Sequence, residues 1–251
     1  MISEPAARGL RVATYNVHRC VGLDWRCSET RIANVIASLA ADIVGLQELS
    51  LRRVGNGSID QAAVIARQLG WNVVFQPALS KAHEDFGDAI ISRFPLRLVR
   101  AAELPGGSPW YCREPRWVLW VEVETNIGAV QVMNTHLGLG RGERLVQTQW
   151  LASENWLGSV AGDTPLVLLG DFNFSPGSPP HQQLTGCLHD IGQLMRQYLR
   201  TFPTYFPLFA VDHILVSDHF SVPDVHVHRS WPAAIASDHF PLVAELKRAG
   251  A

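Results

Sequence analysis

Lysine and net positive charge are scarce in this chain of 251 residues. Only Lys81 and Lys247 are lysines among 21 Lys and Arg residues, and the formal net charge is -2 at pH 7. These values exclude a strongly basic nucleic-acid-binding protein, although a local basic patch is compatible with them. The chain also has no run of about 18 apolar residues and no apolar segment near Met1. We therefore expect neither a transmembrane helix nor a signal peptide.

Cysteine is scarce as well. The four cysteines form no Cys-x-x-Cys pair, and no cysteine–histidine spacing typical of a structural zinc site is present. We therefore expect free thiols in a reducing compartment and a cytoplasmic protein. Hydrophobic residues make up 47% and charged residues 18% of the chain, which is typical of a soluble globular core and excludes a disordered chain.

The sequence also lacks low-complexity segments, short repeats and linkers. Proline and glycine cluster at residues 104–115 and 175–180, but core-like strands lie on both sides of each cluster. We interpret both clusters as surface loops. The sequence thus predicts one domain over residues 1–251, with its core between residues 11 and 246.

Short β-rich runs alternate with helical patterns along the chain. We expect strands at 10–17, 42–47, 71–75, 89–92, 117–124, 129–134, 166–169, 213–217 and 242–246. A short turn separates 117–124 from 129–134, which predicts an antiparallel hairpin. We expect helices after the N-cap Ser28, after a capping box that begins at Ser58, and over 141–157. This order favours a mixed sheet or a sandwich flanked by helices over a doubly wound parallel sheet.

Several expected strands end in polar residues that a protein core does not bury cheaply. Asp171 and Asn173 alternate with Phe172, so in an extended backbone both polar side chains point to the same side. A carboxylate beside an amide suits a site where one group takes a proton from water and the other stabilises an oxyanion. An Asx-rich turn that closes the strand is the alternative interpretation.

Oxygen donors dominate these strand ends. Glu48 ends a strand with a buried pattern, where a carboxylate needs a partner or a metal. With Asp171, Asp238 and the amide of Asn16, it provides the oxygen ligands that Mg²⁺ or Mn²⁺ prefers. Taken singly, Glu48 is also compatible with a solvated strand end and Asn16 with a turn residue.

Two Asp-His dipeptides, Asp212-His213 and Asp238-His239, occur among the ten histidines. Adjacent residues of a strand point to opposite faces, so neither dipeptide is itself a hydrogen-bonded pair. The carboxylate of one dipeptide must therefore serve a histidine from elsewhere in the chain. A histidine held by a carboxylate is oriented and biased toward its cationic form, which is useful against a phosphate.

Taken together and in order, these motifs resemble those of the endonuclease/exonuclease/phosphatase superfamily, which includes deoxyribonuclease I and bacterial sphingomyelinases. The matching segments run from residue 11 to residue 246. The resemblance implies an α+β fold, a four-layer α-β-β-α sandwich of two mixed, mostly antiparallel sheets flanked by helices. It also implies hydrolysis of phosphate esters with Mg²⁺ or Mn²⁺. On the metal side, Glu48 resembles the main ligand, helped by Asn16 and Asp238.

The resemblance implies further roles on the catalytic side. Asp171 resembles the carboxylate that orients or deprotonates the attacking water, and Asn173 resembles the donor to a phosphate oxygen. His136 and His239 resemble the two histidines near the scissile phosphate. Asp212 resembles the carboxylate that orients one of these histidines, and the resemblance leaves open which one.

The sequence departs from the family pattern at Asp88, where asparagine is usual. The acid puts a donor role there in doubt and adds negative charge near the substrate. The tryptophan-cysteine-aspartate-arginine box of the inositol 5-phosphatases and the lysine-rich stretches of several repair nucleases are missing. Arg113 and Arg116 share a Pro/Gly-rich loop with Trp110 and Tyr111, which fits substrate binding by stacking or ion pairing. A packed surface loop is the alternative interpretation.

These features predict a divalent-metal-dependent phosphoester hydrolase. We expect a phosphodiesterase that acts on a small-molecule or lipid-like substrate and does not bind duplex DNA strongly. A metal-dependent nuclease and a small-molecule phosphatase are the alternatives within the same chemistry. A binding module that kept the fold without catalysis is the alternative of another class.

Overall fold

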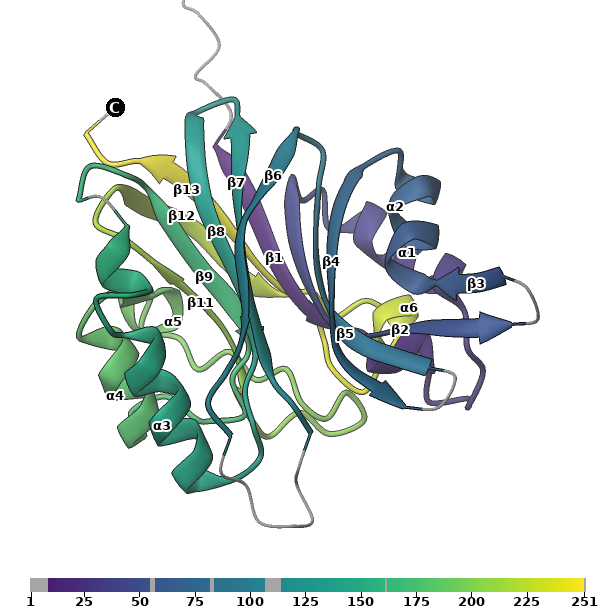
Figure 1. The fold of residues 1–251 in the computed structure, drawn as a ribbon. Coiled ribbons are helices and arrows are strands. Elements are labelled where there is room, and N and C mark those ends of the chain that lie inside the picture. The colour runs from purple at the N-terminus through teal and green to yellow at the C-terminus, as the bar shows by residue number, and fades with distance from the viewer. Residues whose placement is uncertain (1–8, 55–56, 82–83, 107–113, 161, 251) are drawn as a thin grey trace, which may run out of the picture.

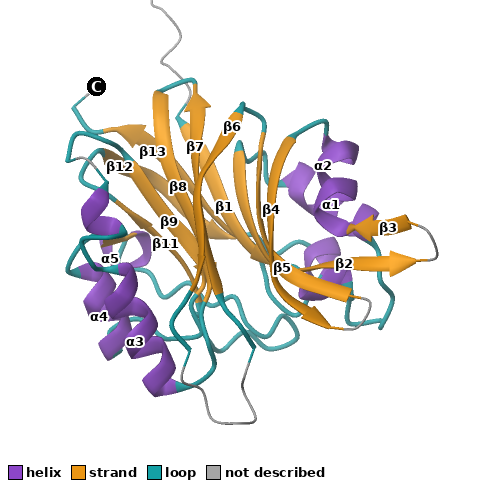
Figure 2. Cartoon of the chain, viewed as in Figure 1, coloured by secondary structure: helices purple, strands orange, loops and turns teal. Residues whose placement is uncertain are grey.

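The computed structural model describes residues 9–54, 57–81, 84–106, 114–160 and 162–250. The strands form two sheets (Figures 1 and 2). The first sheet has the order β12 (Phe220–Val227), β13 (Leu242–Arg248), β1 (Leu10–Asn16), β2 (Ile43–Val54), β5 (Glu84–Ser92) and β4 (Asn72–Lys81), with β3 (Gly57–Asp60) paired to β2. The second has the order β10 (His189–Asp190), β11 (Asp212–Val216), β9 (Leu166–Asp171), β8 (Gly128–His136), β7 (Trp117–Thr125) and β6 (Leu96–Glu103).

Helices cover the outer face of each sheet (Figure 1). The first sheet carries α1 (Glu29–Ser38), α2 (Gln61–Leu69) and α6 (Trp231–Ala236), and the second carries α3 (Arg141–Leu151), α4 (Pro179–Thr185) and α5 (Ile191–Leu194). Three apolar clusters fill the three interfaces between these layers. Within the described ranges, all sheet pairs are antiparallel except β1–β2 and β8–β9. The four-layer α-β-β-α sandwich expected from the motifs is therefore confirmed.

Strand β1 shows why an inner strand of this fold is apolar on both faces. Leu10 and Val12 belong to the cluster between the two sheets, whereas Ala13 and Tyr15 belong to the cluster under the helices. All four side chains are fully buried. Because both faces are covered, the strand is a nearly continuous apolar run, and each large side chain stabilises the fold by about 1.5–3 kcal/mol.

The helix starts follow the capping rules, with one difference from expectation. Ser28 caps α1 and accepts a hydrogen bond from the backbone N–H of Arg31, as expected. Helix α2 begins later than expected, because Asp60 is its cap and accepts from the N–H of Ala63 at 3.0 Å. Ser58 instead lies in β3, where its backbone pairs with β2. The capping box predicted at Ser58 is therefore wrong.

Helix α3 is shorter than expected and ends at Leu151 rather than at residue 157. The chain leaves the helical path there and buries Trp156 completely. The Trp156 ring packs 4.8 Å from that of Trp150 and 6.2 Å from that of Trp120, measured between centroids. The apolar contacts of one tryptophan thus outweigh the weak helical pattern of this segment.

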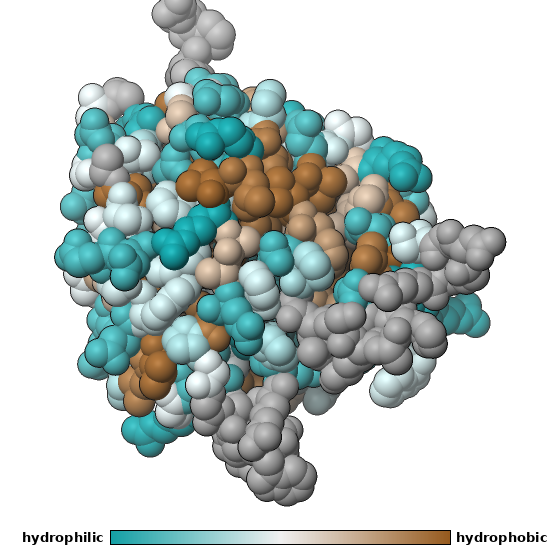
Figure 3. All heavy atoms as spheres, in the orientation of Figure 1, coloured by the Kyte–Doolittle hydropathy of each residue, from teal (hydrophilic) through white to brown (hydrophobic). Residues whose placement is uncertain are grey.

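The surface has one conspicuous apolar area in the view of Figure 3. It gathers over the face where the edge strands β6 and β4 lie, and Leu98 and Val99 of β6 are among the exposed large apolar residues. Cys20, Cys27 and Cys187 are free thiols, as expected, and Cys112 lies outside the described residues. None of the described helices is both long enough and apolar enough to cross a bilayer.

A polar contact joins the two sheets near one edge. Asn134 of β8 donates its amide hydrogens to the carbonyls of Leu46 at 3.0 Å and Ala89 at 2.9 Å, both in the first sheet. Its Oδ1 atom accepts from Gln47 Nε2 at 2.7 Å. The sheets approach closely here, since a Cβ on Gly45 would lie 2.8 Å from Asn134 Oδ1. We call this set of hydrogen bonds the Asn134 clasp.

Candidate active site

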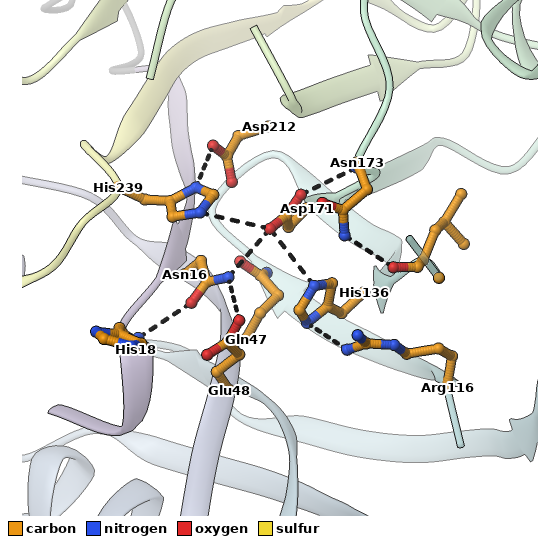
Figure 4. Close-up of polar contacts among 12 residues, drawn as sticks. Asn16, His18, Gln47, Glu48, Arg116, His136, Asp171, Asn173, Asp212 and His239 are labelled. Carbon is orange, nitrogen blue, oxygen red and sulfur yellow. Dashed lines mark hydrogen bonds and ion pairs between the residues drawn. The ribbon is translucent and has the colours of Figure 1, made fainter. Parts of the chain in front are cut away.

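The polar residues expected at strand ends converge from both sheets at one edge of the sandwich (Figure 4). Because β1 and β2 are parallel, they bring Asn16 and Glu48 to the same edge of the first sheet. In the second sheet, the parallel pair β8–β9 places His136 opposite Asp171. Strand β11 runs antiparallel to β9 and begins at this edge, where Asp212 pairs with Asp171.

Asp171 lies at the centre of the polar contacts and is buried. Its Oδ2 atom accepts from Asn16 Nδ2 at 3.0 Å. The Nε2 atoms of His136 and His239 lie 3.5 Å and 3.7 Å from the same oxygen. Burial and the nearby carboxylate of Asp212 raise the pKa of Asp171 to about 6. At neutral pH this carboxylate is ionised, yet it is more basic than an ordinary aspartate.

His239 is held in its cationic form. Its Nδ1 atom lies 2.8 Å from Asp212 Oδ2, which also accepts from the hydroxyl of Thr201 at 2.5 Å. Burial alone would lower the pKa of His239, but the carboxylates of Asp212 and Asp171 outweigh it and raise the pKa to about 10. Of the two histidines left open by the sequence, the structure therefore pairs Asp212 with His239.

His136 has the opposite protonation state. Arg116 Nη1 donates to His136 Nδ1 at 3.0 Å, which leaves the proton of the neutral ring on Nε2, toward Asp171. Burial lowers the pKa of His136 well below its ordinary value, and the charges of Arg116 and His239 lower it further. Two titratable groups whose environments separate their pKa values are typical of an acid–base site.

Glu48 lies in a bulge of β2 rather than at the end of a strand. The strand continues to Val54, and its pairing with β5 shifts register between Leu46 and Leu49. Glu48 has a φ of 57°, a left-handed conformation that costs a non-glycine residue about 1 kcal/mol or more. The bulge directs the carboxylate to the site, where Oε1 accepts from Asn16 Nδ2 at 3.0 Å.

A left-handed turn begins two residues after Asn16. His18, Arg19 and Cys20 have φ values of 45°, 54° and 59°, and none of them is glycine. The backbone N–H of His18 donates to Asn16 Oδ1 at 3.0 Å. The NH₂ group of Asn16 therefore faces the carboxylates, so Asn16 acts here as a donor that holds two acids. Its role as an oxygen ligand stays a prediction.

Asn173 follows the end of β9 and also has a left-handed backbone, with a φ of 52°. Its backbone N–H donates to Asp171 Oδ1 at 3.0 Å, and its Nδ2 atom donates to the carbonyl of Leu137 at 2.9 Å. An amide group has two N–H donors, so one remains for a ligand. Asn173 lines the cavity described below, which is compatible with the expected role as a phosphate-oxygen donor.

Asp88 lies beside Glu48 and is buried. Burial raises the pKa of Asp88 to about 7, with the charges of Glu48 and Asp171 adding to the effect and Arg116 opposing it. A pKa raised this far leaves the carboxyl group partly protonated at neutral pH. The negative charge expected at this position is therefore partial. The protonated form has an O–H donor where asparagine would offer an N–H donor.

One cavity of about 570 Å³ is lined by Glu48, His136, Asp171, Asn173 and His239. Arg116, Asp88 and Asp238 lie on its wall as expected, and Asp238 Oδ1 is 3.9 Å from His18 Nδ1. Apolar groups of Phe86, Leu139 and Phe202 also contribute to the wall. The remaining expected substrate-binding residue, Arg113, lies outside the described residues, together with Trp110 and Tyr111.

The cavity offers oxygen donors of the kind that a divalent cation prefers. Glu48, Asp88, Asp171 and Asp238 present carboxylates to the same cavity. The charges of Glu48 and Asp171 help to raise the pKa of Asp88, so the acids repel one another in the protein alone. A cation among them would relieve that repulsion, and hard oxygen donors suit Mg²⁺ or Mn²⁺.

A second buried polar group lies behind this site. His213 Nδ1 is 2.7 Å from Asp190 Oδ2, and His213 Nε2 is 3.1 Å from the carbonyl of Phe174. His181 lies 3.5 Å from the same carboxylate oxygen. His213 therefore contacts Asp190 while Asp212 contacts His239 of the site, so the two neighbours point to opposite sides of β11.

Sequence reasoning missed several of these residues. Thr201, Asp190 and His181 carry no local motif, because their partners lie far away in the chain. Arg19 does have a signal, since it lies three residues after Asn16. Its left-handed backbone could not be anticipated, because arginine has no preference for that conformation.

Comparison with known proteins agrees with this geometry. The model of the Endonuclease/Exonuclease/phosphatase family matches residues 13–239. The uncharacterized protein YbhP of Escherichia coli (strain K12) is 25% identical over 249 residues, covering 94% of this chain and 95% of YbhP.

Solved structures have the same fold. An endonuclease/exonuclease/phosphatase from Beutenbergia cavernae DSM 12333 has a TM-score of 0.74 at 25% identity, covering 97% of this chain and 72% of that chain. The mannosyl-6-phosphatase Bt3783 of Bacteroides thetaiotaomicron VPI-5482 has a TM-score of 0.73 at 22% identity, covering 95% of this chain and 99% of that chain. Since the family match spans every motif from Asn16 to His239, the protein belongs to the endonuclease/exonuclease/phosphatase family of phosphoester hydrolases.

Proposed function

We propose that the protein is a divalent-metal-dependent phosphodiesterase that acts on small or lipid-like phosphodiesters. The observation that carries this proposal is the arrangement of three groups in one cavity. A cationic His239 and a neutral His136 lie on either side of the Asp171 carboxylate. Phosphodiester hydrolysis needs a base for water, a donor to the phosphate and a cation that offsets charge, and this arrangement offers all three.

The residues of the cavity have different roles in the proposed hydrolysis. A divalent cation held by Glu48 and Asp238 would supply Lewis-acid stabilisation of charge on the phosphate. Asp171 takes a proton from water, because its raised pKa of about 6 makes it a better base than an ordinary aspartate while leaving it ionised at neutral pH. His239 offsets negative charge on the non-bridging oxygens, and the Nε2–H group of His136 donates to one of them.

Two amides support this arrangement. Asn16 holds the carboxylates of Glu48 and Asp171 through one NH₂ group, with both contacts at 3.0 Å. Asn173 lines the cavity and supplies a further N–H donor toward a phosphate oxygen. Both amides act by position, since neither carries charge.

The cavity supports a small substrate. Its volume of about 570 Å³ lies in the range of small-molecule sites. The apolar side chains of Phe86, Leu139 and Phe202 suit a substrate with an apolar or aromatic part. A structural relative is named a mannosyl-6-phosphatase, which is compatible with small phosphoesters in this fold. The net charge of -2 argues against the many phosphate contacts that strong binding of duplex DNA needs.

Turnover of bis(p-nitrophenyl) phosphate tests the reaction class. We expect hydrolysis with Mg²⁺ or Mn²⁺ and none in excess EDTA. Glu48→Gln should weaken the response to metal, and Asp171→Asn should lower kcat by about 10²- to 10⁴-fold. The exposed residues Glu103 and Asp163 provide matched controls as Glu103→Gln and Asp163→Asn. Full activity in excess EDTA would overturn the metal assignment, and turnover of Asp171→Asn near the parent rate would overturn the role of Asp171.

Duplex DNA distinguishes the nuclease alternative. We expect weak binding of labelled duplex DNA in the presence of Mn²⁺, with a shallow dependence on salt. Submicromolar binding near physiological salt, with a steep salt dependence, would favour a nuclease over the proposed phosphodiesterase of small substrates. Failure to hydrolyse any diester with either metal would instead favour a binding module that kept the fold.

A further inference from the structure

Arg19 lies on the wall of the cavity but takes no part in the mechanism proposed above. It belongs to the left-handed turn that follows Asn16. Figure 4 shows its neighbour His18 on the side of Asn16 and Glu48, across Asp171 from Arg116. The turn that contains His18 therefore lies on the side of the site that carries Glu48, away from Arg116.

The backbone of this turn is held from outside. The carbonyl of Arg19 accepts from Gln61 Nε2 at 2.8 Å, and the carbonyl of Cys20 accepts from the N–H of Ser28 at 2.9 Å. The side chain of Cys20 is fully buried. Three successive non-glycine residues in left-handed conformations persist only where such contacts over-determine them, and such segments cluster at functional sites.

The turn places two groups at the site. The N–H of His18 orients the Asn16 amide, as described above. The next residue, Arg19, lines the cavity and is exposed to solvent. Within this described turn, only the N–H of His18 contacts the Asn16 side chain, so the left-handed conformation of Arg19 is not needed to orient that amide.

The charges of the cavity leave Arg19 available for a ligand. Arg116 is already engaged, with Nη2 at 3.2 Å from Glu114 Oε2 and Nη1 at 3.0 Å from His136 Nδ1. His239 is paired with Asp212. In the part of the chain that the structure describes, no carboxylate pairs with the Arg19 guanidinium. Among the described lining residues, Arg19 is thus the arginine free to bind an anion.

We infer that Arg19 binds a second phosphate group, so that the substrate is a phosphoester with a further phosphate besides the scissile one. A guanidinium matches two phosphate oxygens through paired N–H donors, which an ammonium cannot do. A substrate with a neutral or cationic head group gains nothing from this contact. The inference rests on the proposed function only in that the scissile phosphate occupies the floor of the cavity near Asp171 and His239.

A series of bisphosphate ligands tests the inference by binding alone. The protein carries Asp171→Asn to prevent turnover, and calorimetry with Mn²⁺ compares 1,2-ethanediol, 1,3-propanediol and 1,4-butanediol bisphosphates with the corresponding alkyl monophosphates. We expect one chain length to bind about tenfold more tightly than its monophosphate, beyond the statistical advantage of two equivalent phosphates. Arg19→Gln should reduce that ratio by about fivefold or more, and Arg19→Lys should restore it only in part. Equal ratios in the parent and in Arg19→Gln would overturn the inference.

Two further variants keep the test specific. Arg67 lies exposed on α2, so Arg67→Gln makes the same change of charge away from the cavity and should leave the ratio unchanged. Arg19→Gly removes the cation while relieving the left-handed backbone, so it should fold as well as Arg19→Gln and lose the same selectivity. A ratio retained by Arg19→Gly would also overturn the inference. The two proposals can fail separately. If Arg19→Gln lowers the ratio of bisphosphate to monophosphate affinity but the parent enzyme hydrolyses no diester, the proposed function is overturned and the inference about Arg19 is not.

Discussion

Asp212 and His239 form a buried pair, with 2.8 Å between Asp212 Oδ2 and His239 Nδ1. The other carboxylate oxygen of Asp212 has no hydrogen-bond partner in the described structure. The carboxylate is thus directed at the imidazole and at the hydroxyl of Thr201. This arrangement fixes the orientation of the ring and keeps it cationic, with Nε2 toward Asp171.

Asp212→Asn should therefore damage catalysis without removing the shape of the site. The neutral amide can still contact the ring, but it no longer stabilises the imidazolium. We expect kcat to fall by about 10²- to 10³-fold with a smaller change in KM. The double variant Asp212→Asn/His239→Ala should be no worse than His239→Ala alone, because the two residues act as a unit. Additive losses in kcat would show that Asp212 acts independently of His239.

The protonation states of the two site histidines can be measured directly. At pH 7.5 in EDTA, nitrogen chemical shifts should identify His239 as an imidazolium and His136 as a neutral ring with its proton on Nε2. Arg116→Met removes the donor to His136 Nδ1 and the nearby positive charge, so His136 should titrate at a higher pH than in the parent. A cationic His136 in the parent would contradict the assignment.

The neighbours Asp212 and His213 should behave differently on substitution. His213 contacts Asp190 and the carbonyl of Phe174, away from the cavity. We expect His213→Ala to lower the free energy of unfolding by about 3 kcal/mol while kcat of the folded enzyme stays within about threefold of the parent. Asp212→Ala should abolish most activity. Thermal unfolding and steady-state kinetics on the same samples separate the loss of stability from the loss of activity. A severe loss of kcat in folded His213→Ala would contradict the prediction that His213 acts only on stability.

The Asp190–His213 pair should make stability depend on pH in a defined window. Burial alone would lower the pKa of His213, but the Asp190 carboxylate outweighs it and raises the pKa. This contribution is complete below the ordinary histidine pKa of about 6.5 and is lost as the pH rises through the raised value. Burial alone would raise the pKa of Asp190, but the nearby His181 ring and the hydrogen bond from His213 outweigh it and lower the pKa. This contribution is complete above about pH 3.9 and is lost as the pH falls through the lowered value.

Asp190→Asn should remove this dependence. The amide keeps the oxygen that caps α5 by accepting from the N–H of Gln193. It loses the charge that raises the pKa of His213. We therefore expect the difference in Tm between parent and variant to be largest near pH 5 and to shrink as the pH rises above the raised pKa of His213. A difference in Tm that is the same across this range would assign the loss to packing alone.

Much of the fold could be predicted from local patterns, and the errors have physical causes. The hairpin of β7 and β8 and the cap at Ser28 depend on short-range signals, and both occur as expected. Strand β6 escaped prediction because it is an edge strand, with exposed positions such as Leu98 and Val99 and no clear alternation. The short helices α4, α5 and α6 owe their existence to packing against the sheets, which local patterns do not record.

The residues of the site were more predictable than their contacts. Order along the chain was enough to select Glu48, Asp171 and His239, because each carries a motif. The pairing of Asp212 with His239 depends on a register between strands and a loop from elsewhere in the chain, so only the structure decides it. The bulge at Glu48 was equally hidden, because the polar pair Gln47-Glu48 predicts the end of a strand rather than a bulge within one.

The Asn134 clasp has a consequence for how the two sheets are kept in register. Apolar contacts between stacked sheets have no strong directional preference, so one sheet sliding over the other by a fraction of an ångström changes their energy little. Hydrogen bonds are directional, and those from Asn134 to Leu46 and Ala89 would stretch at once. Each sheet carries part of the active site, with Glu48 on the first and His136 on the second. The hydrogen bonds of Asn134 therefore keep these two residues aligned. The apolar layer between the sheets therefore does not have to fix the alignment of the catalytic groups by itself.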